Sequence, residues 1–271
     1  MKLKDFPVVI LAGGFGTRLR EQTEFIPKPM VPIGTKPILW HIMKIYSYHG
    51  YKRFIICLGY KGEIIKEYFF HYGIRNSDFT VNLGNHENIR VHNLHREDDW
   101  EVTLADTGLK GMTGARIRRI EKYIDTDRFL LTYGDGLANI EIEKLVNFHI
   151  SHRKIATITG VRPPSRFGEL ITEGGRVIEF GEKPQVGSSM INGGFFVFNR
   201  GIFSYLSEDD QCTLEREPLE RLAKNGELMV YQHTGFWQCM DTLRDVNLLN
   251  EYWESGNVPW KVWGKDEIIK K

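Results

Sequence analysis

The chain reads Pro7-Val8-Val9-Ile10-Leu11-Ala12-Gly13-Gly14-Phe15-Gly16-Thr17-Arg18-Leu19 near its N-terminus, and this segment indicates the fold class. Its first part is apolar and largely β-branched, which predicts a strand that is buried on both faces. Glycines follow at once, so the chain turns sharply at the carboxyl end of that strand. Ligands of open α/β sheets bind at this edge, and the segment therefore also predicts the position of a site.

Helical and extended segments alternate along the rest of the chain. The segment 37–50 begins at a proline, ends at a glycine and carries Ile38, Ile42 and Ile45 on one helical face. The alternation predicts parallel βαβ units in one Rossmann-like α/β domain over residues 1–271, with a mixed, mostly parallel sheet and antiparallel additions. We expect helices at 37–50, 63–72, 115–123, 141–153, 217–224 and 242–255, strands at 54–59, 102–105, 128–133, 155–159 and 194–198, and a hairpin at 169–180.

Residues 77–101 interrupt this alternation. They are polar, rich in Asn, His and Asp, and contain only short alternating pieces, at 79–83 and 90–94. Structureless loops of this length are uncommon inside compact domains and commonly have a role. We therefore expect a hairpin or extended arm inserted into the domain.

The composition is that of a globular enzyme. The 271 residues are 41% hydrophobic and 26% charged, and the formal net charge is +1. This balance excludes a global electrostatic attraction to nucleic acid or to an anionic membrane. The three cysteines are widely spaced and form no zinc-binding pattern, and the apolar run at the N-terminus is too short to span a membrane. The expectation is a cytoplasmic protein with reduced thiols.

The glycine-rich turn is the first candidate site. Glycines at 13, 14 and 16 let the backbone approach a ligand and present N–H groups to phosphate oxygens. Arg18 adds a guanidinium that can bind phosphate oxygens through two hydrogen bonds. The turn is not a Walker A loop, because no GK[ST] follows, and it lacks the dinucleotide pattern GxGxxG. Taken alone, it is also compatible with a purely structural turn.

Lys28 is the second candidate, because it stands between Pro27 and Pro29. The two prolines fix their own φ angles and keep the flanking backbone extended. A lysine held in this way soon after a phosphate loop is a candidate counter-charge for a triphosphate. The alternative is a surface lysine in a turn.

Two aspartates are candidate metal ligands. Asp135 ends a buried strand between Gly134 and Gly136, which leave space for a bulky ligand. Asp241 stands between an apolar segment and the helix expected from residue 242. Carboxylates suit Mg²⁺, which prefers oxygen ligands and keeps several waters. The alternatives are an aspartate in a tight turn for Asp135 and a helix N-cap for Asp241.

A third group of polar residues lies further along the chain. Glu182 can accept hydrogen bonds from sugar hydroxyls, Lys183 can pair with a second phosphate, and Asn192 can both donate and accept. Each residue is weak evidence by itself, because an adjacent Glu and Lys are usually solvent-exposed charges on the surface.

Taken together, these segments are more specific than any one of them. The chain contains, in order, LAGGFGTRL, PKPMVPIGTKPIL, TYGDG, EKP, INGGFFV and FWQCMDT. This order resembles the sugar-1-phosphate nucleotidyltransferase family over essentially the whole chain. Segments 36–47, 59–69, 106–116 and 235–245 resemble its cytidylyltransferase branch. The resemblance implies cytidylyl transfer from CTP to glucose 1-phosphate, Mg²⁺ as the cofactor, and a homo-oligomer, often a hexamer built partly through the inserted arm.

The same resemblance implies a role for individual residues. Arg18 and Lys28 would be catalytic, because they would stabilise charge on the phosphates. A nucleotide-binding role is implied for Leu11, Ala12, Gly13, Gly14, Gly16, Thr17, Arg18, Lys28, Thr107, Gly111, Arg116 and Gly134, a sugar-phosphate-binding role for Tyr133, Glu182, Lys183 and Asn192, and a Mg²⁺-binding role for Asp135 and Asp241.

Four positions depart from the pattern of the family. Ile26 stands where a lysine is usual, Gly111 where a serine or threonine is expected, Cys239 where a proline is expected, and Glu169 where a small residue is common. None of these removes a proposed metal ligand, so we expect activity. Two alternatives stay open, namely transfer with another nucleotide or phosphate acceptor, and a nucleotide-sensing subunit without catalysis.

Overall fold

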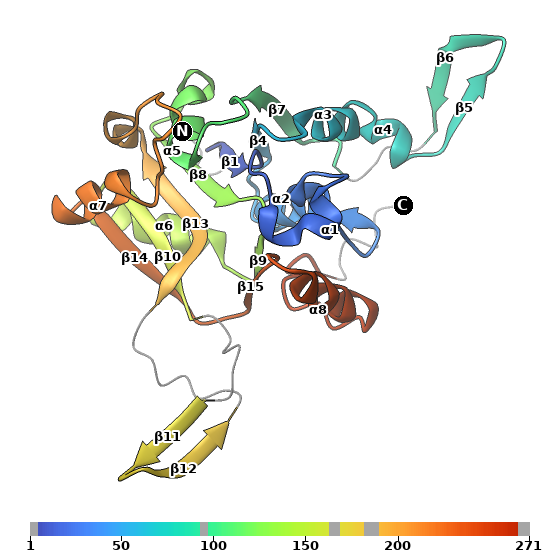
Figure 1. Cartoon of the computed structure of the whole chain (residues 1–271). Coiled ribbons are helices and arrows are strands. Elements are labelled where there is room, and N and C mark those ends of the chain that lie inside the picture. The colour runs from blue at the N-terminus through green and yellow to red at the C-terminus, as the bar shows by residue number, and fades with distance from the viewer. Residues whose placement is uncertain (1–4, 93–96, 163–168, 182–189, 265–271) are drawn as a thin grey trace.

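The computed structural model describes residues 5–92, 97–162, 169–181 and 190–264. A seven-stranded sheet lies at its centre, in the order β14-β10-β13-β8-β1-β4-β7 (Figure 1). The predicted buried strand is β1 (Val8–Leu11), which lies between β8 and β4. The other strands of the sheet are β4 (Arg53–Leu58), β7 (Glu101–Asp106), β8 (Arg128–Tyr133), β10 (Ala156–Val161), β13 (Ile191–Asn199) and β14 (Leu228–His233).

The sheet is mixed and mostly parallel, as predicted. Strands β8, β1, β4 and β7 are parallel to one another, and β10 is parallel to β14. Strand β13 is antiparallel to both of its neighbours, β8 and β10. It is longer than the expected strand over 194–198, because Ile191 and Asn192 already pair with β10.

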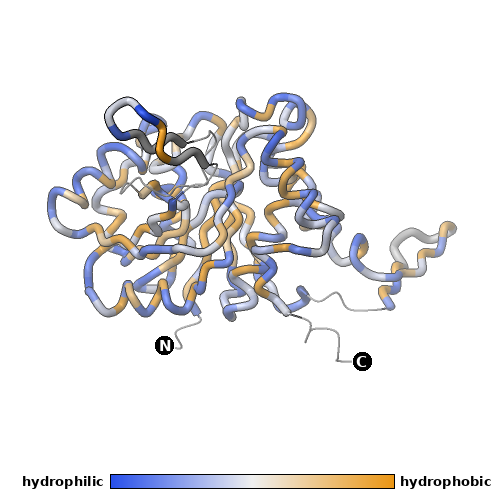
Figure 2. The backbone as a smooth tube through the Cα atoms, turned by 90° about the horizontal axis from the view of Figure 1, so that it is seen from below, coloured by the Kyte–Doolittle hydropathy of each residue, from blue (hydrophilic) through white to orange (hydrophobic). Residues whose placement is uncertain are grey.

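Helices cover both faces of the sheet. Residues Val8 and Ile10 of β1 belong to the core under α2 (Ile38–Tyr48), α6 (Ile142–His152) and α8 (Leu243–Glu254). Val9 and Leu11 point to the other core, under α5 (Thr113–Arg119) and α7 (Glu217–Lys224). Figure 2 shows hydrophobic residues concentrated in the central strands between these two layers. Burial on both faces explains why β1 has no polar residue.

Two predicted helices have different bounds in the structure. The helix expected at 63–72 is divided into α3 (Gly62–Phe70) and α4 (Tyr72–Arg75). The helix expected at 115–123 begins two residues earlier, as α5, and continues as the 3₁₀ turn Glu121–Tyr123. Residues distant in the sequence fix the start of this helix. The N–H of Met112 donates to Asp210 O, and the N–H of Ala115 donates to Cys212 O. Local sequence does not contain these partners.

Two hairpins project from the layered body (Figure 1). The arm expected at 77–101 contains the antiparallel pair β5 (Phe79–Asn82) and β6 (Asn85–Val91), and it ends before Glu101, the first residue of β7. The expected second hairpin is β11 (Glu169–Glu173) and β12 (Arg176–Gly181). Gly174 and Gly175 join its strands, both with positive φ, which is the geometry that favours glycine in two-residue turns.

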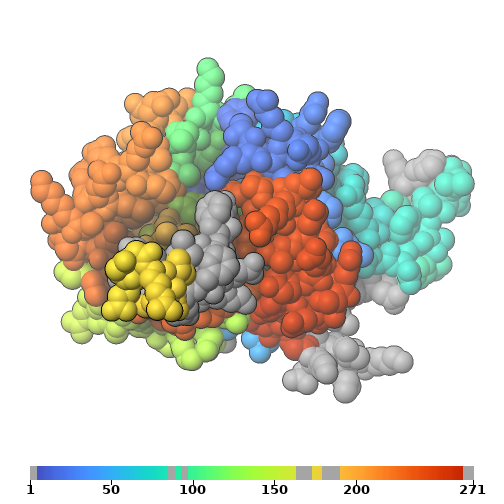
Figure 3. Space-filling view, turned by 60° about the horizontal axis from the view of Figure 1, so that its bottom comes forward, coloured from blue at the N-terminus to red at the C-terminus, as the bar shows by residue number. Residues whose placement is uncertain are grey.

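Distant parts of the chain meet below the sheet. The N–H of Gly34 donates to Asn250 Oδ1 of α8 over 2.8 Å. In Figure 3 the orange-red part of the chain, which includes α8, lies against the blue part that follows the N-terminus. None of the helices in the described ranges has the length and apolar character needed to cross a membrane. The shorter elements are α1 (Arg20–Thr23), β2 (Pro32–Ile33), β3 (Lys36–Pro37), β9 (Gly136–Ala138) and β15 (Trp237–Cys239), with 3₁₀ turns at Thr17–Leu19, Lys28–Met30 and Arg200–Tyr205.

Candidate active site

The glycine-rich turn leaves β1 and closes on itself at Gly16. This residue has a φ of 64°, and its carbonyl accepts hydrogen bonds from Leu19 N and Thr23 Oγ1. A Cβ at Gly16 would lie 2.7 Å from Thr23 Cγ2. Both the left-handed backbone and the close contact therefore require glycine here.

Arg116 lies behind this turn and holds it in place. Its guanidinium donates to the carbonyl oxygens of Gly13, Leu58 and Gly108 at 3.0, 2.9 and 2.8 Å. Another bond, of 2.8 Å, reaches Thr107 Oγ1. The residue is buried, and these acceptors on three separate segments replace its hydration. Arg116 thus ties the ends of β1 and β4 to the segment that follows β7.

Two glycines make room for the Arg116 guanidinium. A Cβ on Gly13 would lie 2.2 Å from Arg116 Nη1, and a Cβ on Gly59 would lie 2.4 Å from the same atom. Neither glycine has a positive φ, so close approach and not backbone conformation accounts for them. Thr107 is also buried, with its hydroxyl donating to Leu58 O at 2.6 Å and accepting from Arg116.

A cavity of 510 Å³ opens between the turn, the segment 109–113 and the end of β8. Of the residues expected to bind the nucleotide, all except Thr107 line this cavity, together with Tyr133 and Asp135. Lys110 adds a basic side chain that the sequence analysis did not single out. The expected residues in the wall are Leu11, Ala12, Gly13, Gly14, Gly16, Thr17, Arg18, Lys28, Gly111, Arg116 and Gly134.

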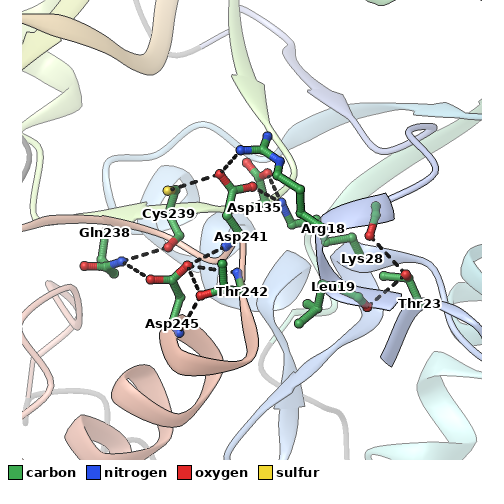
Figure 4. A network of polar contacts seen from close by, with 11 residues as sticks. Arg18, Leu19, Thr23, Lys28, Asp135, Gln238, Cys239, Asp241, Thr242 and Asp245 are labelled. Carbon is green, nitrogen blue, oxygen red and sulfur yellow. Dashed lines mark hydrogen bonds and ion pairs between the residues drawn. The ribbon is translucent and has the colours of Figure 1, made fainter. Parts of the chain in front are cut away.

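Lys28 joins the two aspartates that the sequence analysis selected as metal ligands (Figure 4). Its Nζ lies 2.6 Å from Asp135 Oδ2 and 2.5 Å from Asp241 Oδ1. Arg18 reaches the same site from solvent, with Nη1 2.8 Å from Asp241 Oδ2. The side chain of Lys28 is 12% exposed and that of Arg18 75%, so Lys28 is held in the wall whereas Arg18 can turn toward a ligand.

The charges of this cluster support one another. Burial opposes the charged form of Lys28, but the carboxylates of Asp135 and Asp241 outweigh it and raise the pKa of the lysine. Burial likewise opposes ionisation of Asp241, yet the hydrogen bond from Lys28 and the nearby charge of Arg18 lower the pKa of that carboxyl. Lys28 and Asp241 therefore both favour their charged forms.

Backbone contacts bring the two aspartates together. Strand β15 pairs antiparallel with β9, and the N–H of Met240 donates to Asp135 O at 2.8 Å. The alternative of Asp241 as a helix N-cap is wrong, because Thr242 caps α8 in a capping box with Asp245. Asp245 Oδ2 also accepts from the N–H of Asp241 at 3.0 Å. Asp241 is thereby positioned by the helix start and its carboxylate stays available to Lys28 and Arg18.

The residues expected to bind the sugar phosphate are brought together only in part. Asn192 Nδ2 donates to the hydroxyl oxygen of Tyr133 at 2.9 Å. Tyr133 lies in the cavity wall beside Asp135, at the end of β8. Glu182 and Lys183 lie outside the described residues.

Of the four unusual positions, Gly111 has a structural explanation. A Cβ on Gly111 would lie 2.8 Å from Arg119 Nη1, which donates to Thr107 O, so an arginine occupies the space that a side chain would need. Cys239 Sγ lies 3.8 Å from Asp241 Oδ2, and burial together with that carboxylate raises the pKa of the thiol to about 11. Ile26 packs at the edge of the core. The side chain of Glu169 is outside what the structure describes.

Two further residues matter that sequence reasoning missed. Asp245 follows Thr242 at the spacing of a capping box, a pattern that could have identified it. Glu215 contacts Tyr133 and Thr113, and no local pattern indicates either contact. Within the described ranges, no group of three or more His, Cys, Asp or Glu side chains is arranged to hold a metal ion.

A larger cavity, of 740 Å³, lies away from this cluster, between α3, α4 and β7. Its wall includes Phe69, Trp100 and Leu104, and none of the residues predicted for the site. Size alone therefore does not select the candidate active site, and the convergence of charged groups favours the smaller cavity.

The chain is similar to known proteins over most of its length. The chain matches the family described as nucleotidyl transferase over residues 7–255. It is 53% identical to glucose-1-phosphate cytidylyltransferase of Salmonella typhi over 94% of this chain and 98% of the relative. It is 47% identical to a probable glucose-1-phosphate cytidylyltransferase of Bacillus subtilis over 94% and 99%.

A solved structure shows the same fold. UDP-glucose pyrophosphorylase complexed with UDP-glucose superposes with a TM-score of 0.68 at 16% identity, over 93% of this chain and 99% of that one. The glycine-rich turn at the carboxyl edge of the sheet, the cluster around Lys28 and the near full-length match to these relatives lead to one assignment. The chain belongs to the nucleotidyl transferase family, among its sugar-1-phosphate nucleotidyltransferases.

Proposed function

We propose that this protein transfers the cytidylyl group of CTP to α-D-glucose 1-phosphate, giving CDP-glucose and pyrophosphate. The near full-length relatives named for this activity, at 53% and 47% identity, support the choice of both substrates. Lys28 and Asp135 line the cavity together with the glycine-rich turn, and the contact of Lys28 with Asp135 and Asp241 carries the assignment of chemistry.

The nucleotide half of the site would be the glycine-rich turn with Arg18 and Lys28. Backbone N–H groups of the turn and two cations suit a triphosphate, whose charge they offset. Lys110, an exposed residue that also lines the cavity, adds a third cation. Tyr133, Asn192, Glu182 and Lys183 would form the sugar-phosphate half.

Asp135 and Asp241 would hold Mg²⁺. The fit rests on the donor chemistry: two carboxylate oxygens converge on one cationic centre, the Nζ of Lys28, and carboxylates are the ligands that Mg²⁺ prefers. Within the described residues, the two carboxylates belong to no group of three or more His, Cys, Asp or Glu side chains. Such a pair also suits Mg²⁺, whose coordination shell is commonly completed by waters and substrate phosphates. When bound, the ion would offset phosphate charge and polarise the α-phosphate.

The reaction itself needs little from the protein beyond position and charge. An oxygen of the sugar 1-phosphate attacks the α-phosphorus of CTP in line, the bond to the β-phosphate breaks, and pyrophosphate leaves with the electron pair. The nucleophile is already an anion, so no general base is required. Arg18 and Lys28 stabilise charge on the transferring and leaving phosphates, and the rigid turn keeps the nucleotide in line with the acceptor.

The test is a matrix of nucleotides and acceptors assayed for pyrophosphate release. CTP, UTP, dTTP and GTP are each combined with glucose 1-phosphate, mannose 1-phosphate and a non-sugar phosphate. We expect CTP with glucose 1-phosphate to give the highest kcat/KM. Preference for another pair would reassign the substrates, and tight CTP binding without turnover on any acceptor would identify a nucleotide-sensing subunit instead.

We further propose a cytoplasmic homo-oligomer, a hexamer by family resemblance, whose chain is a single domain. The projecting hairpin β5–β6 supports an interface role, because Phe79, Ile89 and Val91 are exposed on it. Light scattering on the purified protein measures the oligomeric state, and a single cooperative urea transition of the full chain is expected for one domain.

A further inference from the structure

Glu215 links two walls of the 510 Å³ cavity. It precedes α7 and is exposed, and its carboxylate contacts side chains on two other elements. The hydroxyl of Tyr133, at the end of β8, donates to Oε1 over 2.5 Å. The hydroxyl of Thr113, at the start of α5, donates to Oε2 over 2.6 Å. Tyr133 and Thr113 both line the cavity.

The direction of each hydrogen bond in this group is determined. Tyr133 and Thr113 both donate to carboxyl oxygens of Glu215. Thr113 Oγ1 can do so because it accepts in turn from the N–H of Leu214 at 2.9 Å. The hydroxyl oxygen of Tyr133 accepts from Asn192 Nδ2, and Asn192 Oδ1 accepts from the N–H of Gly194 at 2.8 Å. These two contacts together assign the orientation of the Asn192 amide.

The Tyr133 ring is held as firmly as its hydroxyl. Gly194 has a φ of 80°, and a Cβ on it would lie 2.7 Å from Tyr133 Cδ2, so the glycine lets β13 pass close to the ring. The hydroxyl donates to Glu215 and accepts from Asn192, so contacts fix both ends of the side chain.

We infer that Glu215 is a positioning residue for the sugar phosphate, acting through Tyr133 and Asn192. This inference rests on the proposed function. Among the described residues, the Tyr133 oxygen has no partner besides Glu215 and Asn192, so a ligand hydroxyl can donate to it. The second N–H of Asn192 likewise donates to no described residue. The group therefore offers a fixed acceptor beside a fixed donor, which suits vicinal hydroxyls of a sugar ring.

Glu215→Gln tests this arrangement at nearly constant shape. The amide has one acceptor oxygen for two donors, so it cannot satisfy Tyr133 and Thr113 together. We expect the KM for glucose 1-phosphate to rise about tenfold, the worth of roughly one hydrogen bond, while the KM for CTP changes less than twofold. Glu217→Gln, two residues along the chain and exposed, makes the same charge change and should leave both KM values unaltered.

A double-mutant cycle with Tyr133→Phe separates positioning from general distortion. If Glu215 acts through the phenol, introducing Glu215→Gln into the Tyr133→Phe variant should raise the KM for glucose 1-phosphate less than twofold further. Full additivity, or equal rises of KM for both substrates, would overturn the inference. Wild-type protein that releases no pyrophosphate from CTP and glucose 1-phosphate would instead overturn the proposed function, and this inference with it.

Discussion

Lys28 and Asp135 form an ion pair across 107 residues of sequence, with 2.6 Å between Nζ and Oδ2. The lysine follows the first strand of the sheet, and the aspartate follows β8, which is parallel to β1 and adjacent to it. Because parallel neighbours end at the same edge, the two charges meet where the cavity opens. The ammonium group of Lys28 therefore lies beside the carboxylates of Asp135 and Asp241 and lines the same cavity as the glycine-rich turn.

We expect Lys28→Met to lower the rate of pyrophosphate release about 10²–10³-fold, the usual cost of removing one preorganised charge that stabilises a transition state. Methionine keeps an unbranched side chain of similar length but removes the ammonium. Lys224→Met, at an exposed position of α7, is the control and should retain full activity. A Lys28→Met protein within threefold of the wild-type rate would contradict the assigned role.

Gly13→Ala should destabilise the fold, whereas Gly14→Ala should not. The new methyl group at 13 would overlap the Arg116 guanidinium, which cannot move without losing bonds to Leu58 O and Gly108 O. Overpacking of this kind costs about 1–3 kcal/mol of unfolding free energy. Apart from its chain neighbours, no atom of the described residues lies within 4 Å of a Cβ at Gly14. Urea unfolding of both variants measures the difference, and equal stability would show that Arg116 relaxes freely.

Asp245→Asn should weaken both the start of α8 and the position of Asp241. Asp245 Oδ2 accepts from Asp241 N, Thr242 N and Thr242 Oγ1, and Oδ1 accepts from Gln238 Nε2. An amide would turn a donor toward one of these donors. We expect a loss of about 1–2 kcal/mol in unfolding free energy and a several-fold higher Mg²⁺ concentration for half-maximal rate.

Two measurements are needed for Asp245→Asn, urea unfolding and a Mg²⁺ titration of pyrophosphate release. Glu254→Gln, exposed near the other end of α8, controls for loss of one negative charge. An unchanged Mg²⁺ requirement in Asp245→Asn would show that Asp241 is positioned by the β9–β15 pairing alone.

Stability should fall with pH below about 6.5, partly through His149. This residue is fully buried and bonded to Thr157 and Asn199, and burial lowers its pKa to about 4. In the unfolded chain this histidine has an ordinary pKa and binds a proton below about pH 6.5, whereas in the folded protein it stays neutral until about pH 4. The stabilisation that is present above pH 6.5 is therefore lost as the pH falls toward 4. Between pH 7.5 and 5 the contribution is about 2 kcal/mol.

Urea unfolding at pH 7.5 and 5.0 tests this prediction. His149→Gln should show a pH-dependent loss about 2 kcal/mol smaller than the wild type, because glutamine does not titrate. His71→Gln, at an exposed position, should behave like the wild type. Identical pH dependence in all three proteins would show that His149 is not held neutral in the folded state.

Features that depend on neighbouring residues could be predicted from the sequence alone. The apolar run Val8–Leu11, the glycines after it and the proline and glycine that bound α2 act through local backbone geometry and burial periodicity. The same holds for the turn at Gly174 and Gly175. The order of the motifs along the sequence also indicated Lys28, Asp135 and Asp241 as candidate site residues. No local sequence pattern predicts that these three side chains are in contact.

Only the tertiary structure determined which of these residues meet and what surrounds them. Arg116, expected at the nucleotide, is buried behind the turn and bonded to carbonyls of three segments. Glu215 joins Tyr133 and Thr113 from 82 and 102 positions away. Such contacts depend on the order of strands in the sheet and on where its loops end, and these are properties of long-range packing that no local pattern encodes.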